Sequence, residues 1–79
     1  MQSTIILYTK ENCGLCEEAK GLLESLQLQY PFQMEERDIY TNEEWLQEYQ
    51  LMIPVVEIDG IQFYGEQLQP EVLQEALSK

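Results

Sequence analysis

The sequence predicts an α/β domain in which three helices flank a four-stranded mixed sheet. Apolar residues recur with the periods of strand, helix, strand, helix, two-strand hairpin and helix, in that order. The strand–helix–strand start requires a right-handed crossover and a parallel strand pair. The hairpin, marked by Asp59-Gly60, adds an antiparallel pair. Because 79 residues suffice for one core and not two, we assign residues 1–79 to a single domain.

The first half of the chain predicts a strand, a helix and a second strand. Residues 4–8 are β-branched and apolar, which is typical of a strand buried on both faces, and the polar residues 9–12 predict a loop. Leucines and an alanine then recur at steps of three and four over residues 14–27, which indicates a helix. Gly21 inside this helix indicates close packing on the sheet. Residues 32–39 predict the second strand.

The second half of the chain predicts a short helix, a hairpin and a final helix. Thr41 followed by Glu44 forms a capping box, with the threonine as the cap of the short helix. Residues 54–58 and 61–64 are rich in β-formers, and the Asp-Gly pair between them favours a type I′ turn, since both turn positions need positive φ. Pro70 suits the first turn of the last helix.

Charge restricts the partners that this chain can have. Fifteen acidic residues stand against four basic ones, with no histidine, for a formal net charge of −11. A chain of this charge should repel nucleic acid and anionic membranes, so neither is expected as a partner. A partner that docks near the functional site should be basic or neutral. The start of the sequence does not resemble an export signal and no apolar run approaches a membrane span of about 20 residues, which predicts a cytoplasmic protein.

The two cysteines, Cys13 and Cys16, are three positions apart. Their disulfide would stabilise the fold only weakly. Closing a loop of about four residues stabilises a folded protein by roughly 2 kcal/mol, whereas closing a loop of about 100 residues stabilises it by nearly 5 kcal/mol. A zinc site needs about four N or S ligands, whereas the chain offers two thiols and no imidazole, so no metal site is predicted. A metal would require carboxylates, a bound thiol or a second subunit. Redox chemistry of a dithiol explains the spacing best.

Two segments carry a resemblance to a known family. Residues 7–16, Leu-Tyr-Thr-Lys-Glu-Asn-Cys-Gly-Leu-Cys, resemble the active-site segment of glutaredoxins, and residues 52–56, Met-Ile-Pro-Val-Val, are similar to the family's cis-proline segment. The whole chain also matches that family in length and element order. The closest resemblance is to divergent glutaredoxin-like proteins that lack Pro-Tyr between the cysteines. The resemblance implies the thioredoxin/glutaredoxin fold, with element order β-α-β-α-β-β-α.

The resemblance implies a thiol–disulfide oxidoreductase acting on protein or small-molecule disulfides, without a bound cofactor. Cys13 would be the exposed nucleophile at the start of a helix, whose N–H groups stabilise a thiolate, and Cys16 would be the resolving thiol. Two alternatives stay open. One is a redox-sensing interaction module, and the other is an iron–sulfur or metal carrier without turnover.

The resemblance also implies substrate-binding positions. In glutaredoxins the lysine that matches Lys10 meets a carboxylate of glutathione, although Lys10 could also be an ordinary solvated lysine. Leu15 stands where the family has an aromatic residue between the cysteines. A cis Pro54 would turn the backbone of Ile53 toward a substrate strand; a trans proline that begins the strand is the alternative.

The reductant is less closely defined. Glutaredoxins follow their last strand with a Gly-Gly pair and an aspartate that hold glutathione, and here only Gly65 remains. Met52 replaces a threonine of the family pattern. Both glutathione and a thioredoxin-reductase-type reductant therefore stay open as electron donors.

Overall fold

Four strands form one mixed sheet in the computed structural model, which describes residues 3–78. The strands are β1 (Ser3–Thr9), β2 (Phe32–Asp38), β3 (Val55–Ile58) and β4 (Ile61–Tyr64), in the spatial order β2-β1-β3-β4. β1 pairs parallel with β2 and antiparallel with β3, and β3 pairs antiparallel with β4. The predicted mixed sheet is therefore confirmed.

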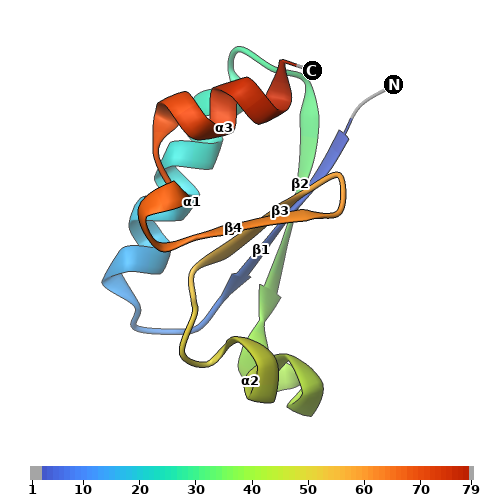
Figure 1. The fold of residues 1–79 in the computed structure, drawn as a ribbon. Coiled ribbons are helices and arrows are strands. Elements are labelled where there is room, and N and C mark those ends of the chain that lie inside the picture. Colours follow the sequence, from blue (N-terminus) through green and yellow to red (C-terminus); the bar gives the residue numbers. More distant parts are fainter. Residues whose placement is uncertain (1–2, 79) are drawn as a thin grey trace.

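Three helices cover this sheet: α1 (Gly14–Gln27), α2 (Glu43–Tyr49) and α3 (Pro70–Leu77). In Figure 1, α1 and α3 lie side by side on one side of the sheet, while α2 lies near the ends of β2 and β3. Two short 3₁₀ turns complete the chain, η1 (Ile39–Thr41) after β2 and η2 (Gly65–Gln67) after β4. No helix within residues 3–78 is long and apolar enough to cross a membrane.

Each face of the sheet has its own core because side chains alternate along β1. Ile5 and Leu7 are fully buried in the larger core, beneath α1 and α3, whereas Tyr8 points into a smaller core beside α2. The larger core consists of Ile5, Leu7, Ala19, Leu23, Leu26, Phe32, Val56, Ile58 and Leu73. Burial on both faces, as predicted for β1, fixes the end of this strand between two packed layers.

Aromatic rings build the smaller core. Tyr8 stacks on Tyr49 with ring centroids 4.2 Å apart, and Trp45 meets Tyr8 edge to face at 5.9 Å. Arg37 lies over the rings of Tyr8 and Trp45, donates to the Tyr8 hydroxyl at 3.0 Å and pairs with Glu35. These contacts hold β1, β2 and α2 together at the end of the sheet where β1 leads into the cysteine loop.

Two local predictions about the segment before α2 were wrong. β2 ends at Asp38, and Ile39 begins η1 instead of ending the strand. The N-cap of α2 is Asn42 and not Thr41: the Asn42 side chain accepts from the N–H groups of Glu44 and Trp45, at 2.9 and 3.2 Å. The Thr41 hydroxyl instead donates to the Asp38 carbonyl at 2.6 Å, within the turn that precedes the helix.

The expectation for Gly21 was also wrong. This glycine lies on the exposed side of α1, and a Cβ there would meet nothing within 4 Å. Close packing on the sheet therefore does not explain it. The Asp59-Gly60 turn, in contrast, has the positive φ values expected, 51° and 84°.

Candidate functional site

Cys13 and Cys16 form a disulfide at the start of α1. Cys13 is the N-cap residue of the helix, and its sulfur accepts a hydrogen bond from the backbone N–H of Cys16 at 3.1 Å. The two thiols differ in access: Cys16 is 2% exposed and packs in the first turn, whereas Cys13 is only half-buried. Cys13 is therefore the more accessible residue of the pair.

The loop between β1 and α1 presents this pair at the carboxyl end of β1. Asn12 has a φ of 56°, in the left-handed region that asparagine tolerates better than most residues, and it turns the chain into Cys13. Lys10 is exposed in the same loop, and no ion pair within residues 3–78 holds its ammonium group. Lys10 is near Cys13 in sequence, but it does not line the groove described next.

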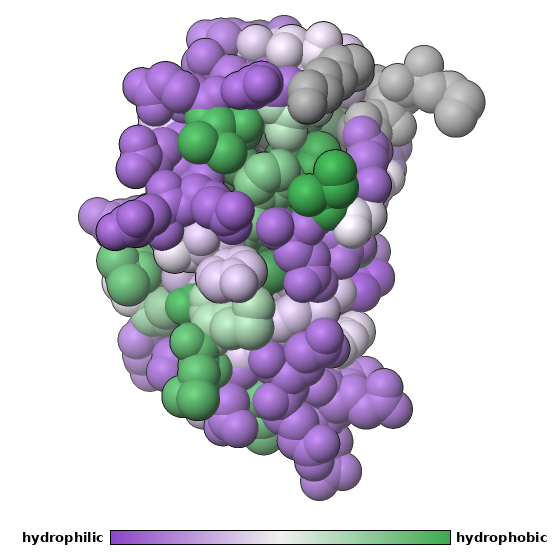
Figure 2. All heavy atoms as spheres, in the orientation of Figure 1, coloured by the Kyte–Doolittle hydropathy of each residue, from purple (hydrophilic) through white to green (hydrophobic). Residues whose placement is uncertain are grey.

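A groove of about 570 Å³ opens between α1, the loop before β3 and the end of β4. It brings together three of the predicted binding residues, Leu15, Ile53 and Pro54. The full lining is Leu15, Glu18, Ala19, Leu22, Leu51, Met52, Ile53, Pro54, Tyr64, Gly65 and Leu68. Figure 2 shows hydrophobic residues gathered near the start of α1 and the loop before β3, with hydrophilic residues around them.

The loop before β3 is fixed to α2 by backbone hydrogen bonds. The N–H groups of Met52 and Ile53 both donate to the Tyr49 carbonyl, at 2.8 and 3.0 Å. The Ile53–Pro54 peptide bond is cis, and Pro54 is buried. Since the N–H of Ile53 is already used within the chain, a substrate strand could not accept a hydrogen bond from it.

Several groove residues were missed by the sequence prediction. Leu51 is 95% exposed and Tyr64 is 45% exposed, and both line the groove. Glu18 is the one charged residue in the lining. The sequence contains one indication that Leu51 belongs to a binding surface. Leu51 lies just beyond the apolar stripe of a short helix, at a position where core packing does not require an apolar residue.

Two cations in residues 3–78 are held by contacts outside the groove lining. Lys20, on α1, pairs with Glu36 of β2 at 3.4 Å, and this hydrogen bond and charge raise the pKa of Lys20. Arg37 is held in the smaller core. No group of three or more His, Cys, Asp or Glu side chains in residues 3–78 is placed to hold a metal ion.

Residues 4–79 match the family model described as "Glutaredoxin-like domain (DUF836)". No curated protein matches the chain.

Solved structures share the fold. The chain is 26% identical to protein Ne2328 from Nitrosomonas europaea, with a TM-score of 0.82 over 98% of this chain and 93% of the other. It is 28% identical to a mutant of the thioredoxin-like protein BC3987, with a TM-score of 0.66 over 95% and 99% of the two chains. A malarial protein at 12% identity and a TM-score of 0.71, over 99% and 96%, shows the fold alone.

Proposed function

The chain belongs to the glutaredoxin-like domain family, and on this premise we propose that it is a thiol–disulfide oxidoreductase. The observation that carries the proposal is the Cys13–Cys16 disulfide at the start of α1, in which Cys13 is half-buried, Cys16 is buried, and Leu15 between them lines a groove. A pair with this division of access can undergo two successive exchange reactions in which each thiol has its own role.

In the reduced protein, Cys13 would attack as a thiolate. The N-cap position and the N–H of Cys16 place backbone donors at its sulfur, and the positive end of the helix dipole favours the negative charge. Attack on a substrate disulfide forms an S–S bond between Cys13 and one substrate sulfur, and the other substrate sulfur leaves as a thiolate.

Cys16 would then resolve this mixed disulfide. Its thiolate attacks the sulfur of Cys13, the Cys13–Cys16 disulfide forms, and the second substrate sulfur leaves. The substrate gains two electrons and two protons, which the protein dithiol supplies. A second dithiol or two monothiols must reduce the protein again, and glutathione or a thioredoxin-reductase-type reductant would serve. A cytoplasmic location, as expected from the sequence, would keep the pair reduced between turnovers.

Turnover of a small neutral disulfide tests this proposal. Bis(2-hydroxyethyl) disulfide would be the substrate, with glutathione and its reductase as one electron donor and a thioredoxin reductase system as the other. We expect wild type to turn over with at least one donor and Cys13→Ser to be inactive with both. Cys16→Ser should lose activity with the thioredoxin reductase system, because the mixed disulfide is not resolved. A wild-type protein that is inert with both donors would overturn the proposal.

A further inference from the structure

The groove is lined by Leu15, which lies between the two cysteines in the chain, and it gathers apolar side chains that the fold leaves uncovered. Six large hydrophobic residues within residues 3–78 are exposed, and three of them line this groove: Leu15 at 66%, Leu51 at 95% and Tyr64 at 45%. They come from α1, the loop before β3 and the end of β4, so the fold concentrates them at one place. Contiguous exposed apolar residues of this kind mark a binding surface.

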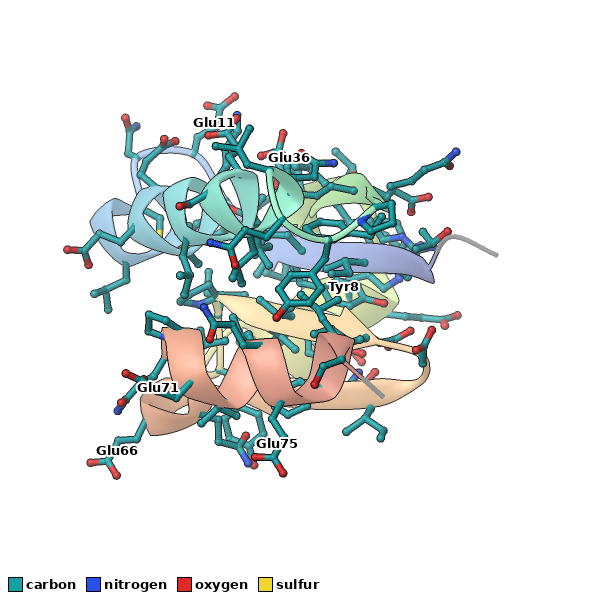
Figure 3. All side chains as sticks on the ribbon, turned by 90° about the horizontal axis from the view of Figure 1, so that it is seen from above. Tyr8, Glu11, Glu36, Glu66, Glu71 and Glu75 are labelled. Carbon is teal, nitrogen blue, oxygen red and sulfur yellow. A yellow bond between two sulfur atoms is a disulfide. The ribbon has the colours of Figure 1, made fainter. Side chains whose placement is uncertain are left out.

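The one charged side chain in the lining of this groove is acidic. This is Glu18, and Glu66 follows the lining residue Gly65, while Lys20, which follows the lining residue Ala19, is paired with Glu36 of β2. Figure 3 shows Glu11, beside the start of α1, and Glu66, after β4, both pointing outward from the molecule. No cation of residues 3–78 lines the groove, so nothing in it neutralises an anionic ligand.

We propose that the groove binds an extended protein segment that carries a disulfide, a large apolar side chain next to its cysteine, and a lysine or arginine that pairs with Glu18. Leu15, Leu51 and Tyr64 would cover the apolar side chain. Glutathione, with two carboxylates and one ammonium group, has neither a large apolar side chain nor a lysine or arginine. This inference rests on the oxidoreductase function and names its substrate class.

The reaction on such a substrate balances as a dithiol–disulfide exchange. The Cys13–Cys16 dithiol and the substrate disulfide become the protein disulfide and two substrate thiols. The apolar contacts and the Glu18 ion pair act in the first step, since they hold one substrate sulfur near Cys13 before the S–S bond forms.

Two matched peptide disulfides test the charge preference. Each is the symmetric disulfide of a short peptide with one cysteine beside a leucine, and the peptides differ only in two flanking lysines or two flanking glutamates. The measurement is the second-order rate constant for oxidation of the reduced protein, at about 150 mM salt to limit long-range steering. We expect wild type to prefer the lysine peptide by about tenfold.

Charge reversal at Glu18 separates the effect of a charge in the groove from the effect of the net charge of the protein. Glu18→Lys should reduce the preference for the lysine peptide by about fivefold or more. Glu17→Lys is the matched control, because it makes the same change in net charge one residue away, beside the same cysteines and outside the lining. Equal effects of the two substitutions would contradict the role of Glu18.

Truncation of an exposed leucine tests the apolar contacts. Leu51→Ser should slow the reaction with the lysine peptide by about threefold. Leu28→Ser is its control, since Leu28 is 89% exposed at the far end of α1 and away from the groove. Neither leucine is in a core, so both variants should fold.

A binding measurement without disulfide exchange separates failure of this inference from failure of the proposed function. The same peptides with serine in place of cysteine are titrated into ¹⁵N-labelled oxidised protein and followed by NMR chemical shifts. Shifts at the groove residues with the lysine peptide and weaker ones with the glutamate peptide support the inference, even if no disulfide is turned over and the proposed function fails. Equal binding, or no binding, overturns the inference even when turnover is seen.

Discussion

Cys13 and Cys16 are identical thiols that the first turn of α1 makes different. The N-cap position leaves the sulfur of Cys13 within reach of solvent and directs a backbone N–H toward it. One turn further, the same helix carries Cys16 into the packed layer between helix and sheet. The proposed division between an attacking and a resolving thiol would therefore follow from position along one helix turn.

Tyr49 gives a prediction about pH at the residue scale. Burial raises its pKa above the ordinary value of about 10, and the hydrogen bond that its hydroxyl accepts from Gln62 at 2.7 Å opposes this only in part. The folded state therefore holds the phenol proton more tightly than the unfolded chain does. The resulting stabilisation is complete below pH 10 and is lost as the pH rises through the folded-state pKa.

We expect the free energy of unfolding in urea to fall as the pH rises above about 10, and Tyr49→Phe to flatten this fall. The variant should be about 1 kcal/mol less stable at pH 7, because it loses the hydrogen bond with Gln62. Tyr40→Phe is the control, since Tyr40 is 64% exposed and belongs to neither core. An unaltered alkaline slope in Tyr49→Phe would show that other groups cause the loss.

At the scale of elements, the turn before α2 shows how neighbouring polar residues divide their roles. Asp38, Thr41 and Asn42 are all good capping residues by type. The Asp38 carboxylate accepts from the Tyr40 N–H at 2.9 Å, and the Thr41 hydroxyl donates back to Asp38. Asn42 is left to cap α2, one residue later than the sequence pattern indicates.

Removal of this cap should weaken α2. Asn42→Ala leaves the N–H groups of Glu44 and Trp45 without their side-chain acceptor, so we expect the free energy of unfolding to fall by about 1 kcal/mol. Urea denaturation followed by the fluorescence of Trp45, the one tryptophan of the chain, measures this directly. Asn42→Asp keeps an acceptor oxygen and should retain most of the stability. A loss as large in Asn42→Asp would mean that the amide group matters beyond capping.

At the scale of the whole molecule, the net charge of −11 opposes folding through repulsion among carboxylates. Only two ion pairs, Lys20–Glu36 and Arg37–Glu35, are formed within residues 3–78. The same charge favours a basic partner at the groove, so the feature that limits stability also serves the proposed selection of substrates.

Salt should therefore stabilise the protein. We expect the urea midpoint to rise when NaCl is raised from about 10 to about 200 mM, because screening weakens repulsion between surface charges. KCl should act equally, which separates screening from binding of a particular cation. A midpoint that stays constant or falls would indicate that the ion pairs contribute more than the repulsion costs.

The sequence by itself determined the element order, the mixed sheet and the position of Cys13 at the start of a helix. These features are local. The period of apolar residues indicates a helix or a strand, and an Asp-Gly pair indicates a hairpin. A strand–helix–strand unit has one favoured handedness. The resemblance to glutaredoxins pointed to Leu15, Ile53 and Pro54, which the structure brings to one groove.

Only the tertiary structure decided which residues complete that groove. Leu51 and Tyr64 are apolar in the sequence like many core residues, and nothing local shows that no neighbour covers them. Exposure depends on which surfaces of α1, the loop before β3 and β4 meet, and together those segments span about 50 residues of the chain, from Leu15 to Tyr64. For the cysteine pair, the resemblance implied that Cys13 is the exposed member, and the physical reason is that packing between helix and sheet buries Cys16 and leaves Cys13 half-buried.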